Sequence, residues 1–306
     1  MLYVRPDFYD DFRCIAGACR HSCCVGWEID VDAESLAYYK NIEGELGRAL
    51  RESIDPEPTP HFRLGEGERC PFLRADGLCR LILALGEDSL CDICALHPRF
   101  FNDYPGREEA GLGLCCEEAA RLLTEGKGHL RLVAEADGGE APEPTPLLKR
   151  REEIFAILAD DALSLTERMR RAMEKTGRPL AAFKAPETAR FFLTLERMDP
   201  DWTALLEALA AGGDAEAEPR LSALRYARIA EYLVYRHFAA AETEEAAARR
   251  LQFCFHAVRL IAALEMYSGE ALRLFSAEIE YSDENVEKIC AWLAAPGGKS
   301  FASSAL

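Results

Sequence analysis

The cysteines of this 306-residue chain are concentrated near its N-terminus. Ten of the twelve lie within the first 116 residues, and only Cys254 and Cys290 follow. The run CRHSCC, residues 19 to 24, places three cysteines within six positions. Cysteine in a protein core behaves as a small hydrophobe, which fits the apolar surroundings of Cys254 and Cys290. It does not fit the N-terminal group, whose neighbours are charged or polar, so that group needs another explanation.

Disulfides are the less favoured explanation. They belong to oxidising compartments and to small domains with little core, whereas this chain is long. The opening MLYVRPDFYDDF has acidic residues where an export signal has basic residues followed by an apolar run. The adjacent Cys23 and Cys24 also cannot bridge to each other without strain. We therefore interpret the N-terminal cysteines as metal ligands.

The spacing of the cysteines leaves two kinds of metal site open. The pattern is C-x4-C-x3-C-C, then C-x8-C, then C-x11-C-x2-C, and finally a second C-C pair. The C-x2-C spacing of Cys91 and Cys94 occurs in both zinc and iron–sulfur sites. A zinc ribbon usually has two such pairs, and sulfur-only ligation favours an iron–sulfur cluster. We expect an iron–sulfur cluster, with zinc as the alternative. His21, His61 and His97 lie in the same region and could also bind; we expect His21 at the surface or beside the metal, and His97 to orient a ligand.

Four blocks of the N-terminal sequence resemble the flagellin lysine-N-methylase family, FliB. FRCIAGACRHSCCVGWEIDVD, residues 12 to 32, resembles the family's opening, with its Cys-Cys pair followed by Gly-Trp. CPFLRADGLC (70 to 79), LGEDSLCDICALHPRF (85 to 100) and GLCCEEAARLL (113 to 123) resemble the next three blocks. Weaker similarity continues at residues 226 to 241 and 275 to 289. A simpler relative, the zinc- or iron-chelating CxxCxxCC family, shares the Cys-Cys pair and the C-x8-C block.

The resemblance implies a ligand set and an activity. Cys116 takes the place of the family's cysteine, whereas Cys115 stands where serine is usual. The implied metal ligands are Cys14, Cys19, Cys23, Cys24, Cys70, Cys79, Cys91, Cys94 and Cys116. The implied function is S-adenosylmethionine-dependent methylation of lysine side chains, with flagellin as a candidate substrate and a 4Fe–4S cluster as cofactor. Two alternatives remain: an electron-transfer or metal-handling protein of the CxxCxxCC type, and a zinc-stabilised helical interaction module.

The sequence does not identify a methyl-donor pocket or a catalytic residue. The common strand, glycine-rich turn and helix that bind such cofactors are absent, and so is the C-x3-C-x2-C loop of radical enzymes. A lysine amine, with an ordinary pKa of about 10.4, must lose a proton before it attacks a methyl group. Candidates to accept that proton are Glu28, Asp30, Asp92, Glu118, Tyr104 and Tyr235.

Glycine and proline positions predict a mainly α-helical chain in two parts. Residues 1–134 should form a cysteine-rich metal-binding region of loops and short helices, with a long helix at 32–53 and strands at 27–31 and 129–134. The segment 135–146 is acidic and rich in glycine and proline, which predicts a linker or surface loop. Residues 147–306 should form a non-repeating helical bundle. Its expected helices are 147–176, 187–197, 200–211, 219–240, 243–267, 269–282 and 283–294.

The composition indicates which kinds of macromolecule this protein can bind. The formal net charge of −17 argues against nucleic acid, whose phosphates require clustered basic residues, and suits lysine-bearing protein partners. Hydrophobic residues make up 49 %, which is typical of a globular protein. No run approaches the roughly 20 apolar residues of a membrane helix. We expect a cytoplasmic protein that acts on a protein substrate and contacts no membrane.

Overall fold

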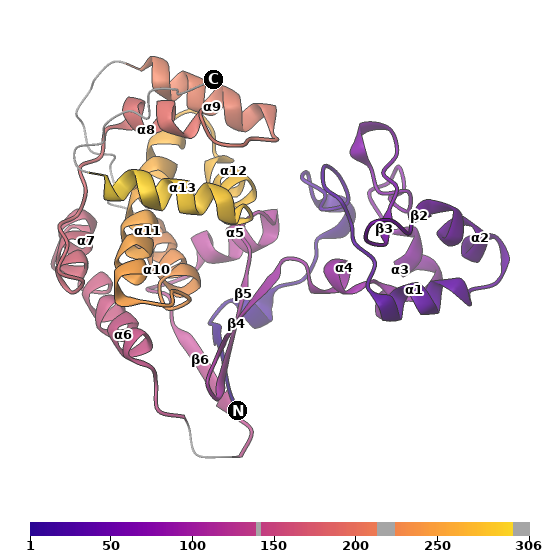
Figure 1. The fold of residues 1–306 in the computed structure, drawn as a ribbon, viewed down its shortest axis with the longest axis horizontal. Helices are drawn as coiled ribbons and strands as arrows, with labels where there is room; N and C mark the ends of the chain where they lie inside the picture. The colour runs from indigo at the N-terminus through magenta and orange to yellow at the C-terminus, as the bar shows by residue number, and fades with distance from the viewer. Residues whose placement is uncertain (139–141, 213–223, 296–306) are drawn as a thin grey trace. The chain divides into compact units, whose positions relative to one another are not determined.

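The computed structural model describes residues 1–138, 142–212 and 224–295 (Figure 1). The chain divides into two compact units. The first, here the helical unit, consists of Met1–Asp11, Phe101–Cys115 and Ala120–Leu306. The second, here the cysteine-rich unit, consists of Phe12–Phe100 and Cys116–Ala119. The structure is mainly helical, as predicted, but it also contains a sheet that the sequence analysis did not anticipate.

The sheet has four strands in the order β4-β5-β1-β6. These are β1 (Leu2–Pro6), β4 (Arg99–Tyr104), β5 (Arg107–Leu112) and β6 (Leu132–Ala136). Strand β1 pairs in parallel with β5 and antiparallel with β6, with Tyr3 opposite Glu108 and Glu135. Only β6 overlaps a predicted strand. Strands from residues 1–11 and 101–134, which the sequence analysis grouped with the metal-binding region, therefore contribute to the helical unit.

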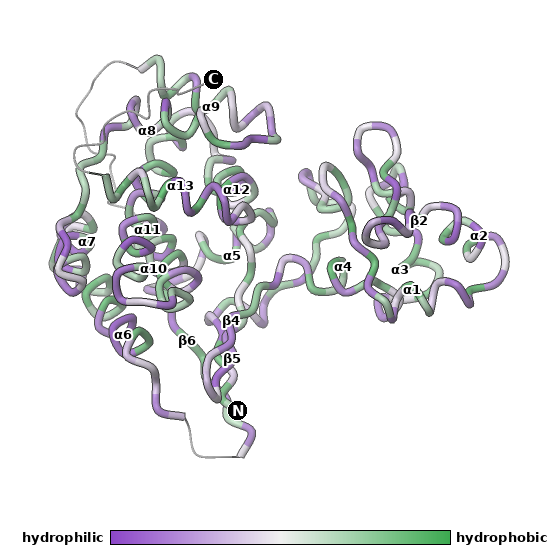
Figure 2. Tube along the Cα trace, viewed as in Figure 1, coloured by the Kyte–Doolittle hydropathy of each residue, from purple (hydrophilic) through white to green (hydrophobic). Residues whose placement is uncertain are grey.

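The helices of the helical unit surround a central helix, α11 (Glu244–Leu264), most of whose side chains are buried. It packs against α7, α8, α9, α10, α12 and α13. Hydrophobic and hydrophilic residues alternate along the outer helices α6 and α7 (Figure 2). The remaining bounds are α5 (Glu117–Glu125), α6 (Pro146–Leu158), α7 (Leu165–Glu174), α8 (Ala185–Phe192), α9 (Pro200–Ala211), α10 (Leu224–His237), α12 (Ala271–Phe275), a π-helical turn (Ser276–Glu280) and α13 (Asp283–Ala294).

Short polar side chains set where several of these helices begin. Each accepts a hydrogen bond from a backbone N–H of the first turn, which would otherwise have no partner. The capping residues are Thr145, Ser164, Asp199, Thr243 and Ser282. Within the described ranges, no helix is long and apolar enough to cross a membrane.

The cysteine-rich unit has short elements around its own core. They are α1 (Ala33–Lys40), α2 (Gly44–Ser53), β2 (Ile54–Asp55), β3 (His61–Phe62), α3 (Arg80–Leu85) and α4 (Asp92–Leu96). Strands β2 and β3 form a two-stranded antiparallel sheet. The core is formed by Ile29, Val31, Tyr39, Leu50, Ile54, Phe62, Cys70, Phe72, Leu81 and Cys91.

Several predicted elements need correction. The helix expected at 32–53 is two helices, because the chain turns between Lys40 and Gly44, whose positive φ of 75° favours glycine. The helix expected at 147–176 ends at Leu158 and restarts at Leu165. The strand expected at 27–31 is reduced to one bridge, from Asp30 to His61. Residues 139–141 of the expected linker and 219–223 of an expected helix lie outside the described residues.

Candidate metal centre

All nine predicted ligands belong to the cysteine-rich unit, whereas Cys115 belongs to the helical unit. The two remaining cysteines are buried in helices of the helical unit, as predicted for core residues. The Cys254 thiol lies 3.3 Å from the carbonyl oxygen of Leu233 on α10, and Cys290 is 3 % exposed. None of the twelve cysteines, all within the described residues, forms a disulfide.

A turn at residues 22–26 places Cys24 beside Cys70. The backbone N–H of Cys24 donates to Ser22 Oγ at 3.2 Å, and the N–H of Cys70 donates to the carbonyl of Cys24 at 2.8 Å. The indole N–H of Trp27 donates to the carbonyl of Cys23 at 2.5 Å and so closes the other side of the turn. The Cys-Cys pair is therefore held in place by its backbone.

The Cys91–Cys94 spacing corresponds to the start of α4. The backbone N–H groups of Cys94 and Ala95 both donate to the carbonyl of Cys91 at 2.9 Å. Asp32 accepts from the N–H of Asp92 at 3.0 Å, while its other oxygen caps α1 through Ser35 at 2.8 Å. One carboxylate thus joins the first turns of two helices and fixes the turn that carries these thiols.

The loop with Cys14 and Cys19 is joined to the start of α5, next to Cys116. Glu117 accepts from the backbone N–H of Arg20 at 3.0 Å and from its guanidinium at 2.9 Å. The Cys19 thiol lies 3.9 Å from the same carboxylate. Two segments almost a hundred residues apart in the sequence therefore place their cysteines in one region of the unit.

Neighbouring thiols shift one another's acidity. The hydrogen-bonding contact with Cys23 lowers the pKa of Cys24 to about 7 against the opposing effect of burial, and the same contact raises the pKa of Cys23. Contact with Cys94 likewise lowers the pKa of Cys91. In each touching pair, therefore, the pKa of one thiol is lowered by the other, and the thiolate is the form that binds metal.

The geometry does not by itself complete a metal site. Among the residues that the structure describes, no group of three or more His, Cys, Asp or Glu side chains is arranged to hold a metal ion. The chemistry of the donors nevertheless fits a soft, thiolate-bound metal. Burial lowers the pKa of His97 to about 4, and its ring centroid lies 6.1 Å from that of Trp27. The ligand assignment stays a prediction.

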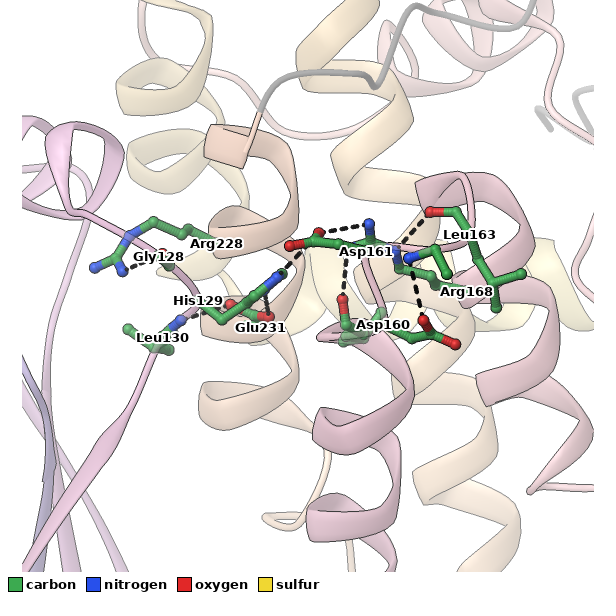
Figure 3. A network of polar contacts seen from close by, with 11 residues as sticks. Gly128, His129, Leu130, Asp160, Asp161, Leu163, Arg168, Arg228 and Glu231 are labelled. Carbon is green, nitrogen blue, oxygen red and sulfur yellow. Dashed lines mark hydrogen bonds and ion pairs between the residues drawn. The ribbon is translucent and has the colours of Figure 1, made fainter.

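The structure also contains a polar network in the helical unit that the sequence analysis missed (Figure 3). His129 lies between two carboxylates, with Nδ1 2.6 Å from Glu231 and Nε2 3.2 Å from Asp161. Arg168 donates to Asp161 at 2.7 Å, and burial raises the pKa of Glu231. Glu231 also accepts from the backbone N–H of Leu130 at 2.7 Å, so the network joins the segment before β6 to α10. A single histidine in a sequence gives no signal of such a contact.

Comparison with known proteins identifies relatives. The chain is 25 % identical over 222 residues to proteins named lysine-N-methylase from Salmonella choleraesuis and Salmonella typhimurium, and each match covers 68 % of this chain and 54 % of the relative. The resemblance to the lysine-N-methylase family is confirmed. A flagellar biosynthetic protein, FliU of Salmonella muenchen, is 28 % identical over 130 residues, or 40 % of this chain and 77 % of FliU. This chain spans about half the length of the lysine-N-methylases it matches. No family model and no solved structure matches it.

Both tyrosines named above as candidate proton acceptors lie in the helical unit, Tyr235 fully buried and Tyr104 half-buried with its hydroxyl inside. The Tyr235 hydroxyl lies 3.1 Å from the carbonyl of Val4 and 2.9 Å from that of Ala110, so it joins α10 to β1 and β5. Burial raises the pKa of Tyr235, and it raises the pKa of Tyr104 to about 12. Both hydroxyls thus keep their protons more firmly than free tyrosine, which disfavours them as bases.

Two adjoining cavities in the helical unit are large enough for a small-molecule ligand. Their volumes are about 540 and 610 Å³, and they share Arg178, Pro179, Ala181 and Ala182. The first is also lined by Gln252, whose side-chain oxygen accepts from the backbone N–H of Ala181 at 3.1 Å, while its buried Nε2 has no partner among the residues that the structure describes. Sequence patterns did not predict either cavity, because their walls come from separate helices and loops.

Proposed function

We propose that this protein is an S-adenosylmethionine-dependent protein lysine N-methyltransferase with an iron–sulfur cluster held by N-terminal cysteines. The similarity to two lysine-N-methylases is the observation that carries the proposal. The flagellar name of a third relative favours flagellin as the substrate. The net charge of −17 suits an acceptor protein with exposed lysines and disfavours nucleic acid. We place the reaction in the cytoplasm.

The reaction requires a deprotonated amine and an accessible methyl group. The lysine nitrogen forms a bond to the methyl carbon as the bond from that carbon to the sulfonium sulfur breaks, and the amine proton passes to a base. Burial of the lysine would lower its pKa and leave more of it neutral. Because Tyr104 and Tyr235 are disfavoured, the base is expected among the remaining carboxylates, Glu28, Asp30, Asp92 and Glu118.

The thiols of the cysteine-rich unit would hold the iron–sulfur cluster. Bound iron of this kind supplies Lewis acidity and one-electron chemistry. The chain's own part is to supply thiolates, and the contact with Cys23, which lowers the pKa of Cys24 to about 7, supports this role. The soft, sulfur-only donor set fits this cofactor better than it fits magnesium or calcium.

The direct test is methyl transfer by anaerobically purified protein. The protein is incubated with isotopically labelled S-adenosylmethionine and flagellin, and lysine methylation is read by mass spectrometry. We expect label on flagellin lysines, with none when the acceptor lysines are replaced by arginine. The alternative, an electron-transfer or metal-chelating protein of the CxxCxxCC type, is favoured by the density of thiols. It predicts metal content and reversible reduction without labelled lysine, which would refute the methyltransferase proposal.

A further inference from the structure

Three buried polar side chains lie on one face of the central helix α11. Gln252, His256 and Arg259 are 6 %, 1 % and 1 % exposed, and their spacing of four and three residues places them side by side. The loop between α7 and α8 crosses this face. The N–H of its residue Ala181 donates to Gln252 at 3.1 Å, and the carbonyl of Ala181 accepts from Arg259 at 3.0 Å. Ala181 lines both cavities described above, while Gln252 lines the first and Arg259 the second.

The amide of Gln252 has a fixed orientation and one unused end. Its oxygen must face Ala181, because a backbone N–H can only donate, so its nitrogen Nε2 is turned away. This nitrogen carries two N–H groups, is buried and has no acceptor within the described parts of the chain. A buried donor without an acceptor is costly, so an acceptor from outside the chain is expected. Because Gln252 lines the first cavity, a ligand bound there can supply it.

The charged side chains around the first cavity favour an anion. The described lining includes the cations Arg178, Lys184 and Arg249 and the carboxylate of Glu187. Arg178 and Arg249 share the carboxylate of Glu245, at 3.3 and 3.0 Å, and Lys184 lies 3.9 Å from Glu187. Two carboxylates therefore face three cations, in a chain whose formal net charge is −17. All of these pairs are exposed, so the anionic group of a ligand can join or replace their contacts at little cost.

The rest of the lining suits the apolar part of an organic molecule. It includes Ala182, Ala248, Leu293 and Trp292. The indole of Trp292 is held in place by stacking on Phe191, with ring centroids 4.4 Å apart and planes inclined by 8°. The volume of about 540 Å³ is that of a site for a molecule the size of a nucleoside derivative, and one inorganic anion would leave most of it unfilled.

We propose that the first cavity binds a small organic anion, whose carboxylate or phosphate group accepts from Gln252 Nε2 and pairs with Arg249, and whose apolar part packs beside Trp292. Two sources share this chemistry. One is the amino-acid carboxylate of a methyl donor, an assignment that rests on the proposed function. The other is the phosphate of a nucleotide, which would act on the protein independently of methyl transfer. No thiol of the cysteine-rich unit takes part in either.

The test compares two neighbouring arginines of α11. Arg249 lines the cavity, whereas Arg250 is absent from the lining and pairs with Glu287 at 2.6 Å. The probe is anilinonaphthalene sulfonate, an aromatic anion, titrated by fluorescence into the full-length protein purified without air. We expect saturable binding that Arg249→Gln weakens several-fold and Arg250→Gln leaves unchanged. N-phenylnaphthylamine, which lacks the sulfonate, should bind the wild type and Arg249→Gln equally.

A substitution at Gln252 tests the amide directly. Gln252→Glu keeps the acceptor for Ala181 but replaces the amide N–H groups by a carboxylate oxygen, so it should weaken binding of the sulfonate by about tenfold or more. Circular dichroism checks the fold, and if this variant does not fold, the exposed Arg249→Gln and Arg178→Gln decide. No binding to the wild type, or equal binding to the wild type and the folded cavity variants, would overturn the proposal.

Competition for the bound sulfonate identifies the source of the anion. S-adenosylhomocysteine supplies a carboxylate, adenosine monophosphate supplies a phosphate, and adenosine is the neutral control. Displacement by S-adenosylhomocysteine makes the cavity the methyl-donor site, and absence of methyl transfer in that protein would refute only the methyltransferase proposal. Displacement by adenosine monophosphate alone makes it a nucleotide site and leaves the methyltransferase proposal standing. Displacement by neither anion, or equal displacement by adenosine, would overturn the anion site.

Discussion

At the scale of single residues, a buried ion pair stabilises the helical unit. Arg151 and Glu109 are 1 % and 0 % exposed, and Arg151 Nη1 lies 2.6 Å from Glu109 Oε2. Arg107 donates to the other oxygen at 2.6 Å, and the Arg151 guanidinium lies over the ring of Tyr235, 5.1 Å from its centroid. The carboxylate therefore compensates two guanidinium groups, one of them fully removed from water.

We predict that Glu109→Gln destabilises the protein by about 3 kcal/mol, because a neutral amide leaves the buried Arg151 uncompensated. The free energy of unfolding is measured by urea denaturation followed by circular dichroism. The control is Glu284→Gln, which breaks the exposed pair with Lys288 at 2.7 Å and should change the free energy of unfolding far less, because solvent screens that pair. Equal losses in the two variants would show that burial does not strengthen the Glu109 contact.

The cysteines were easier to single out from the sequence than this ion pair. Their density and spacing are visible in the sequence, and the resemblance separated Cys115 from the nine that share the cysteine-rich unit. Glu109 gave no such signal, because a glutamate in the run REEAGL is expected to face solvent. Its partner Arg151 is 42 residues away, and only the fold brings the two together.

At the scale of elements, helices were predicted better than strands. The expected helices 200–211 and 283–294 coincide with α9 and α13, where Pro200 and Ser282 mark the starts. The hydrogen bonds of a helix are local, and the side chains on its buried face recur every three to four residues. A helix is therefore visible in the sequence as a periodic pattern of apolar residues. The strands are short, and β5 contains polar residues that obscure alternation. The pairing of β1 with β5 joins residues about a hundred positions apart. A local sequence pattern cannot predict such a pairing.

We predict that Asp32→Ala weakens both the fold and metal retention in the cysteine-rich unit. The substitution removes the cap of α1 and the acceptor for the first turn of α4, at a cost of about 1–2 kcal/mol. With that turn loosened, Cys91 and Cys94 should release iron to a chelator faster than in the wild type. Ser282→Ala, which removes the cap of α13 in the helical unit, is the control. If both variants release iron at the same rate, Asp32 does not fix the thiol-bearing turn.

At the scale of the whole molecule, the two units differ in what stabilises them. The helical unit has a large apolar core of its own, to which α10 and α11 contribute Leu233, Phe253 and Leu260, each at most 1 % exposed. Such burial stabilises a fold without metal. The cysteine-rich unit has shorter elements and a smaller core, in which Cys70 and Cys91 are buried as thiols. Its stability should therefore depend on whatever binds those thiols.

We predict that removing metal unfolds the cysteine-rich unit and leaves most helices after residue 147 formed. Gathered thiolates repel one another and lose solvation unless a cation lies between them, so metal binding and folding are coupled there. After anaerobic chelation, far-ultraviolet circular dichroism should keep most of its helical signal. Hydrogen exchange should become fast in residues 12–100 and stay slow in α10 and α11. A matched sample reloaded with iron and sulfide should regain protection in residues 12–100. If that segment stays protected in metal-free protein, its apolar core is sufficient and the cysteines are not needed for its folding. If protection is lost in α10 and α11 as well, the two units fold as one, and the metal stabilises the whole chain.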